Sequence, residues 1–116
     1  MDLGLEGKSA VVTGGSMGIG TAVALALAQE GCNVAINYRR HDTEAKEVVK
    51  KIEAMGRKGL AIKADVSSYD DAQNMVTTVV KEFGSLDIMV CNAGINWDGV
   101  IWKMSEKQWD AVINVN

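Results

Sequence analysis

Short apolar runs alternate along the chain with longer stretches whose apolar residues recur every three or four positions. The short runs predict strands and the longer stretches predict helices. The predicted strands span residues 8–13, 33–37, 60–64 and 86–90. The predicted helices span residues 18–30, 42–55, 67–83 and a final stretch from 105 that is still helical at 116. Strands and helices thus alternate, which predicts an α/β fold with right-handed crossovers and a parallel sheet covered on both faces.

The ends of these predicted helices carry residues that suit helix termini. Asp42 or Thr43 can cap the second helix, and Ser67 or Ser68 can cap the third. A glycine, which readily adopts the left-handed conformation that ends many helices, follows each of the first three. These glycines are Gly31, Gly56 and Gly84.

Composition narrows the class of protein. A chain of 116 residues is long enough for one domain that buries about two-thirds of its unfolded surface. The sequence contains no linker or internal repeat, so a second domain is not expected. The 47% of hydrophobic and 23% of charged residues are typical of a soluble globular protein. A net charge of −3 without a basic stripe argues against a nucleic-acid partner.

Location and metal content are predicted from what the sequence lacks. The longest apolar run, residues 22–28, is too short to cross a membrane, and the first residues carry no apolar signal stretch. Cys32 and Cys91 form no C-x-x-C motif, which predicts reduced thiols and a cytoplasmic location. His41, the single histidine, has no nearby cysteine, so no metal site is predicted.

A glycine-rich turn lies between the first predicted strand and the first predicted helix, where residues 13–20 read T-G-G-S-M-G-I-G. Glycine tolerates the positive φ of tight turns and lets the backbone approach a bulky anion. The helix then offers unpaired N–H groups and the positive end of its dipole, which together favour a phosphate site. A glycine cluster alone is also compatible with a plain flexible turn. The candidate phosphate-binding residues are Gly14, Gly15, Ser16, Met17, Gly18, Ile19 and Gly20.

The spacing T-G-x-x-x-G-x-G after a first strand resembles the nucleotide fingerprint of the short-chain dehydrogenase/reductase family. The segments C-N-A-G at 91–94 and I-N-V-N at 113–116 extend this resemblance along the chain. The resemblance implies a Rossmann-like doubly wound parallel sheet, of which residues 1–116 supply the first four strands in the order 3-2-1-4. The chain is thereby expected to be the N-terminal part of an NAD(P)-binding domain.

The end of the second predicted strand bears on the choice of cofactor. An acid there holds the ribose hydroxyl of NAD(H), whereas an arginine accommodates the 2′-phosphate of NADP(H). Residues 37–40 read N-Y-R-R, and Arg39 and Arg40 favour NADP(H), with NAD(H) as the alternative. By resemblance, Tyr38 stands where NAD-preferring relatives carry Asp. Against this, the arginines also suit a solvated basic turn, and Met17 stands where some NADP-preferring relatives carry a basic residue.

The resemblance assigns further cofactor contacts after the third and fourth predicted strands. Asp65 would accept a hydrogen bond from the adenine, and Val66 would pack on the base, although Asp65 can also simply end a strand. The small residues of the C-N-A-G segment would lie against the ribose, and Cys91 replaces the first Asn of the family's N-N-A-G. The contact residues after the fourth strand are Asn92, Ala93 and Gly94.

The catalytic half of the family pattern is missing from these residues. By resemblance, Asn116 matches an Asn that holds a water in the proton relay, and a structural role is the alternative. The family's catalytic Ser, and its Tyr followed four residues later by Lys, have no counterpart, because Tyr38 precedes Asp42 and Tyr69 precedes Gln73 at that spacing. The chain is therefore expected to be a fragment, inactive alone. Its fourth strand is expected to be an exposed, association-prone edge.

Residues 92–98, 103–105 and 109–113 look most like the 3-oxoacyl-(acyl-carrier-protein) reductase branch of the family. This implies an NADP(H)-dependent enzyme of fatty acid biosynthesis that reduces acyl-thioester or other small-molecule substrates and is a homo-oligomer at full length, with no membrane partner. The glucose 1-dehydrogenase and acetoacetyl-CoA reductase branches share much of the pattern. A non-catalytic protein that binds a nucleotide or a partner is the alternative from another class.

Overall fold

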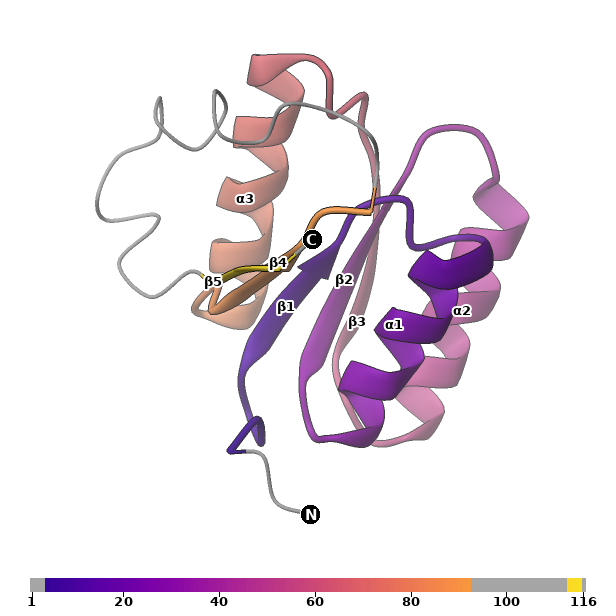
Figure 1. Cartoon of the computed structure of the whole chain (residues 1–116), viewed down its shortest axis with the longest axis vertical. Helices are drawn as coiled ribbons and strands as arrows, with labels where there is room; N and C mark the ends of the chain where they lie inside the picture. The colour runs from indigo at the N-terminus through magenta and orange to yellow at the C-terminus, as the bar shows by residue number, and fades with distance from the viewer. Residues whose placement is uncertain (1–3, 93–112, 116) are drawn as a thin grey trace.

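The computed structural model describes residues 4–92 and 113–115 (Figure 1). In these residues three helices cover a parallel sheet; they are α1 (Gly18–Gln29), α2 (Asp42–Ala54) and α3 (Tyr69–Phe83). The strands are β1 (Ser9–Val12), β2 (Asn33–Tyr38), β3 (Gly59–Lys63), β4 (Ile88–Val90) and β5 (Ile113–Val115). The sheet order is β3-β2-β1-β4-β5, and every adjacent pair is parallel. The predicted α/β class and the order 3-2-1-4 are confirmed.

Helices α1 and α2 cover one face of the sheet and α3 covers the other (Figure 1). Side chains of β1 alternate between these layers, because successive residues of a strand point to opposite faces. Ala10 and Val12 pack with the α1 and α2 side, whereas Val11 packs with the α3 side. All three are fully buried, as expected for a central strand of a parallel sheet.

Strand β5 corrects two predictions. Residues 113–115 were expected to be helical and the sheet to stop at β4, but Ile113–Val115 pairs with β4 in the register Ile88↔Ile113. Strand β4 is thus paired on both sides, so it is not an exposed edge. Pairing satisfies backbone groups that β4 would otherwise leave open, and β-branched Ile and Val suit a strand. Three residues are too few for periodicity to identify. The rest of the predicted fourth helix lies outside the described residues.

The predicted helix ends are confirmed except at α2. Ser68 caps α3 by accepting a hydrogen bond from the Asp71 N–H at 3.4 Å, and Gly84 ends that helix with φ 86°. Helix α2 already begins at Asp42, and no side chain caps it. The Asp42 carboxylate instead lies within the first turn, where negative charge favours the positive end of the helix dipole.

The two cysteines differ in exposure. Cys32 is fully buried, its Sγ lies 3.6 Å from the Leu5 carbonyl oxygen, and burial raises the pKa of its thiol. Cys91 is half-buried and packs against the apolar cluster beneath α3, so it contributes to packing. Among the described residues, the helices are too short or too polar to span a membrane.

Candidate functional site

The predicted site residues gather where the parallel strands end. The loop from Gly14 to Gly20 follows β1, Arg39 follows β2, Asp65 lies just after β3, and Asn92 follows β4. The carboxyl ends of parallel strands share one edge of a sheet, and β1 is paired with β2 on one side and β4 on the other. The chain order therefore reverses at β1, which is where doubly wound folds form their ligand crevice.

The glycines of the loop meet two separate demands. Gly14 and Gly18 have φ values of 64° and 58°, in the left-handed region that side chains disfavour. Gly20 has no room for a side chain, because a Cβ there would overlap the carbonyl oxygen of Gly14 and lie 2.9 Å from the Asn92 side-chain nitrogen. A Cβ on Gly15 would lie 2.7 Å from the Ile36 side chain. The loop therefore packs tightly on β2 and on the end of β4.

Hydrogen bonds fix the loop in this position. The Thr21 hydroxyl, in the first turn of α1, donates to the Gly15 carbonyl at 2.9 Å. The Asn92 side chain donates to the Gly14 carbonyl at 3.4 Å, and the Asn92 N–H donates to the Thr13 hydroxyl at 2.8 Å. The loop is thereby joined both to its own helix and to the end of β4.

The start of α1 is open to an anion. Its N-cap residue, Met17, makes no side-chain capping bond, and its first turn contains no acidic residue. In α3, by contrast, Ser68 caps the helix and Asp70 and Asp71 lie in the first turn. The uncapped N–H groups and the positive end of the α1 dipole therefore face the glycine loop, as a phosphate site requires. Met17 and Ile19 are 51% and 75% exposed, so this end of the helix lies at the protein surface.

A pocket of about 200 Å³ adjoins the loop. It is lined by Gly14, Asn37, Arg39, Ala64, Asp65, Val66 and Ser67. Val66 is buried and gives the pocket an apolar wall. The Arg39 guanidinium lies 3.4 Å from the Asp65 carboxylate, and both side chains are partly exposed, so this ion pair contributes little to stability. A cation and an anion thus lie side by side in the lining of this pocket.

The Asp65 carboxylate is held by the turn that follows it. Its Oδ1 accepts hydrogen bonds from the Ser67 N–H at 3.0 Å and from the Ser67 hydroxyl at 2.6 Å. These two bonds, and then the charge of Arg39, lower the pKa of Asp65 below its usual value. The carboxylate is therefore ionised at neutral pH, and its Oδ2 lies toward Arg39.

We expect Ser67→Ala to raise the pKa of Asp65 toward its ordinary value, because the hydroxyl bond that favours the charged form is lost. A carboxyl whose pKa is lower in the folded state stabilises the fold above the unfolded-state pKa, and this contribution is lost as the pH falls through the folded-state pKa. Ser67→Ala should shrink this acid-sensitive contribution. Carboxyl titration by NMR measures the pKa, and Thr78→Ala on α3, which removes a hydroxyl bond to Asn74, is the control. An unchanged Asp65 pKa would contradict the assignment.

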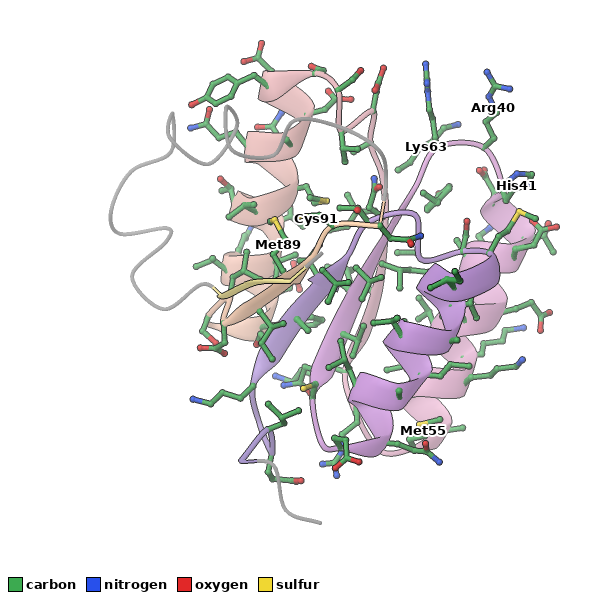
Figure 2. All side chains as sticks on the ribbon, viewed as in Figure 1. Arg40, His41, Met55, Lys63, Met89 and Cys91 are labelled. Carbon is green, nitrogen blue, oxygen red and sulfur yellow. The ribbon has the colours of Figure 1, made fainter. Side chains whose placement is uncertain are left out.

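Most of the predicted binding residues are brought together here, and one is not. The residues of the glycine loop lie at the common strand edge, as do Arg39, Asp65, Val66 and Asn92. Arg40 does not line the pocket, and Figure 2 shows its side chain directed outward from the loop between β2 and α2. Three further predicted residues, Ala93, Gly94 and Asn116, lie outside the described residues.

Three residues of the pocket were not predicted as site residues. Asn37 was expected only in the N-Y-R-R turn, Ala64 only in the third strand, and Ser67 only as a helix cap. A polar residue at the end of an apolar strand, as Asn37 is, was the available signal. Within the described residues, no group of three or more His, Cys, Asp or Glu side chains could hold a metal ion.

A protein-family model and curated sequences both match this chain. The sequence model of the short chain dehydrogenases matches residues 8–116. Two curated relatives are named 3-oxoacyl-(acyl-carrier-protein) reductase FabG. The one from Staphylococcus epidermidis is 48% identical over 109 residues, covering 94% of this chain and 45% of the relative. The one from Staphylococcus aureus is 49% identical, with 94% and 44% covered. The chain thus spans less than half the length of these relatives.

Two solved structures have the same fold. A short chain dehydrogenase from Burkholderia cenocepacia in complex with NADP is 44% identical, with a TM-score of 0.76; the match covers 92% of this chain and 44% of that one. A blue fluorescent protein from a metagenomic library in complex with NADPH is 39% identical, with a TM-score of 0.75; the match covers 78% of this chain and 38% of that one.

Proposed function

Because the chain belongs to the short-chain dehydrogenase family, we propose that residues 1–116 are the N-terminal part of the dinucleotide-binding domain of an NADP(H)-dependent oxidoreductase. One observation carries this proposal. Gly14, which begins the loop leading to the uncapped start of α1, lines one pocket together with Arg39. An anion site beside a pocket with a guanidinium matches the pyrophosphate, adenosine and 2′-phosphate of NADP(H). Two similar proteins were solved in complex with NADP and NADPH, which supports the same cofactor here.

Each residue has a proposed role in holding the dinucleotide. The N–H groups from Ser16 to Gly20 bind the pyrophosphate, because the helix presents them uncapped. Val66 packs on the adenine, Asp65 accepts a hydrogen bond from it, and Arg39 binds the 2′-phosphate. The resemblance adds Ala93 and Gly94 against a ribose, and Asn116 on a catalytic water. Arg40, which lies outside the pocket, contributes only general positive charge.

The bound nicotinamide would exchange a hydride with a carbonyl or secondary alcohol of the substrate. We propose a 3-oxoacyl thioester as that substrate, because the FabG relatives are 48% and 49% identical to this chain. With that substrate, the proposed role of the enzyme is in fatty acid synthesis. The similarity also supports a cytoplasmic homo-oligomer for the whole protein. Glucose 1-dehydrogenase and acetoacetyl-CoA reductase activities are the alternatives.

Substrate and cofactor assays on the intact protein test this proposal. We expect NADPH to bind more tightly than NADH, and we expect NADPH-dependent reduction of an acetoacetyl thioester of the acyl-carrier protein. Acetoacetyl-CoA and glucose, the latter assayed by oxidation, are the competing substrates. Faster turnover of either would assign another branch. NADPH binding with no turnover on any substrate would favour a non-catalytic nucleotide-binding protein, and no dinucleotide binding would refute the proposal.

A further inference from the structure

Asn37 is a buried polar residue at the end of β2, with an exposed fraction of 3%. Its side-chain nitrogen donates to the Ala64 carbonyl at 2.9 Å, and its side-chain oxygen accepts from the Gly14 N–H at 3.3 Å. Its main-chain carbonyl also accepts from the Gly15 N–H at 3.0 Å. One residue therefore holds two successive N–H groups of the glycine loop and the chain just after β3.

These partners lie in two different parts of the candidate site, the phosphate-binding loop and the adenosine pocket. Gly14 begins the glycine loop, and Ala64 immediately precedes Asp65 in the pocket. Arg39, the pocket cation, lies two residues beyond Asn37, just after the end of β2. The amide of Asn37 consequently fixes the distance between the phosphate end and the adenosine end of the site.

The chemistry of an amide suits this position. Ala64 offers an acceptor and Gly14 offers a donor, so the residue between them must both donate and accept. A neutral amide does this without placing a charge in a buried site. An aspartate would have two acceptors, one of them against the Ala64 carbonyl, and burial would disfavour its charged form.

We propose that Asn37 is a positioning residue that sets the spacing between the phosphate loop and the adenosine pocket, and thereby the affinity for a whole dinucleotide. This inference rests on the proposed function, since it requires a dinucleotide at this site. A ligand that occupies both halves depends on their spacing, whereas a ligand that occupies only the pocket does not. That difference distinguishes positioning from a purely structural role.

The first test compares NADPH with adenosine 2′-monophosphate, which reaches only the pocket, in the intact protein. We expect Asn37→Ala to weaken NADPH binding about tenfold or more, as for the loss of a buried hydrogen-bond partner, and adenosine 2′-monophosphate binding much less. Asn33→Ala is the matched control. Asn33 lies at the other end of β2, and its side chain accepts a single bond from the Lys58 N–H at 3.0 Å. This control should change neither affinity.

The second test uses protonation of an aspartate to restore the hydrogen bonds that the Asn37 amide makes. In Asn37→Asp, the protonated acid can donate to Ala64 and accept from Gly14, as the amide does, whereas the ionised acid cannot donate. NADPH affinity relative to wild type should therefore recover as the pH falls. The other charged groups of the pocket are Arg39 and Asp65, and hydrogen bonds from Ser67 lower the pKa of Asp65. Dividing by the wild-type affinity at each pH removes their titration and that of the 2′-phosphate.

The outcomes separate this inference from the proposed function. Equal fractional losses of NADPH and adenosine 2′-monophosphate binding in Asn37→Ala would overturn the positioning role, as would no loss at all. If Asn37→Ala does not fold by circular dichroism, Asn37→Asp decides the question, and an affinity ratio that does not change with pH overturns the role. Failure of the wild-type protein to bind NADPH would refute the proposed function, and with it this inference.

Discussion

Gly20→Ala is expected to abolish dinucleotide binding and to destabilise the protein. The new Cβ would overlap the Gly14 carbonyl oxygen and lie 2.9 Å from the side-chain nitrogen of Asn92. The carbonyl cannot simply move away, because Asn37 holds the N–H groups on both sides of it. We expect at least roughly a hundredfold loss of NADPH affinity and a decrease of about 1–3 kcal/mol in the free energy of unfolding, as for overpacking elsewhere. Fluorescence titration and urea unfolding measure the two effects.

Gly56→Ala is the matched control for this change. Gly56 also lacks a Cβ and has φ 80°, but a Cβ there would meet no atom within 4 Å, and the residue follows α2 away from the site. It should lose about 1 kcal/mol of stability through backbone strain and keep its NADPH affinity. Gly18→Ala should resemble it in stability, since a Cβ at Gly18 also meets open space at φ 58°. A folded Gly20→Ala protein with undiminished affinity would show that this loop is not the phosphate site.

Arg39→Asp is expected to shift cofactor preference from NADPH toward NADH. Arg39 lines the pocket, where its guanidinium can form charge-assisted hydrogen bonds with a 2′-phosphate. Hydrogen bonds to charged groups contribute about 1.5–3 kcal/mol, so NADPH affinity should fall roughly tenfold to a hundredfold. NADH should bind as well as before or better, because the new carboxylate can accept from the ribose hydroxyl. Titrating wild type and variant with both cofactors measures the shift.

Arg40→Asp makes the same change of charge one residue further along, outside the pocket. It should reduce NADPH affinity only slightly, because the exposed charge acts through solvent. Equal shifts in the two variants would mean that net charge, and not a specific contact, sets the preference. Cofactor affinities that neither variant changes would remove the arginines from the cofactor site altogether.

The order of elements as far as β4 and the sheet order 3-2-1-4 could be predicted from the sequence, because each depends on a local pattern or a general rule. Apolar runs between helical stretches predicted the first four strands, and the crossover rule predicted a parallel sheet. The family resemblance of residues 13–20 implied the order 3-2-1-4. Parallel strands end at one edge, so the loops after them had to meet there. The helix ends at Ser68 and Gly84 were likewise predictable, because a cap depends on its own residue type and neighbours.

Only the tertiary structure decided which side chains meet at that edge. The partners of Asn37 lie 23 and 27 residues away in the sequence, and they come together through the pairing of β2 with both β1 and β3. The same registers bring Arg39 to Asp65 and leave Arg40 outside the pocket. The pairing of β5 with β4 also depends on a neighbouring strand and not on residues 113–115 themselves. Register is a property of two strands at once, and a shift of one residue turns every side chain to the opposite face.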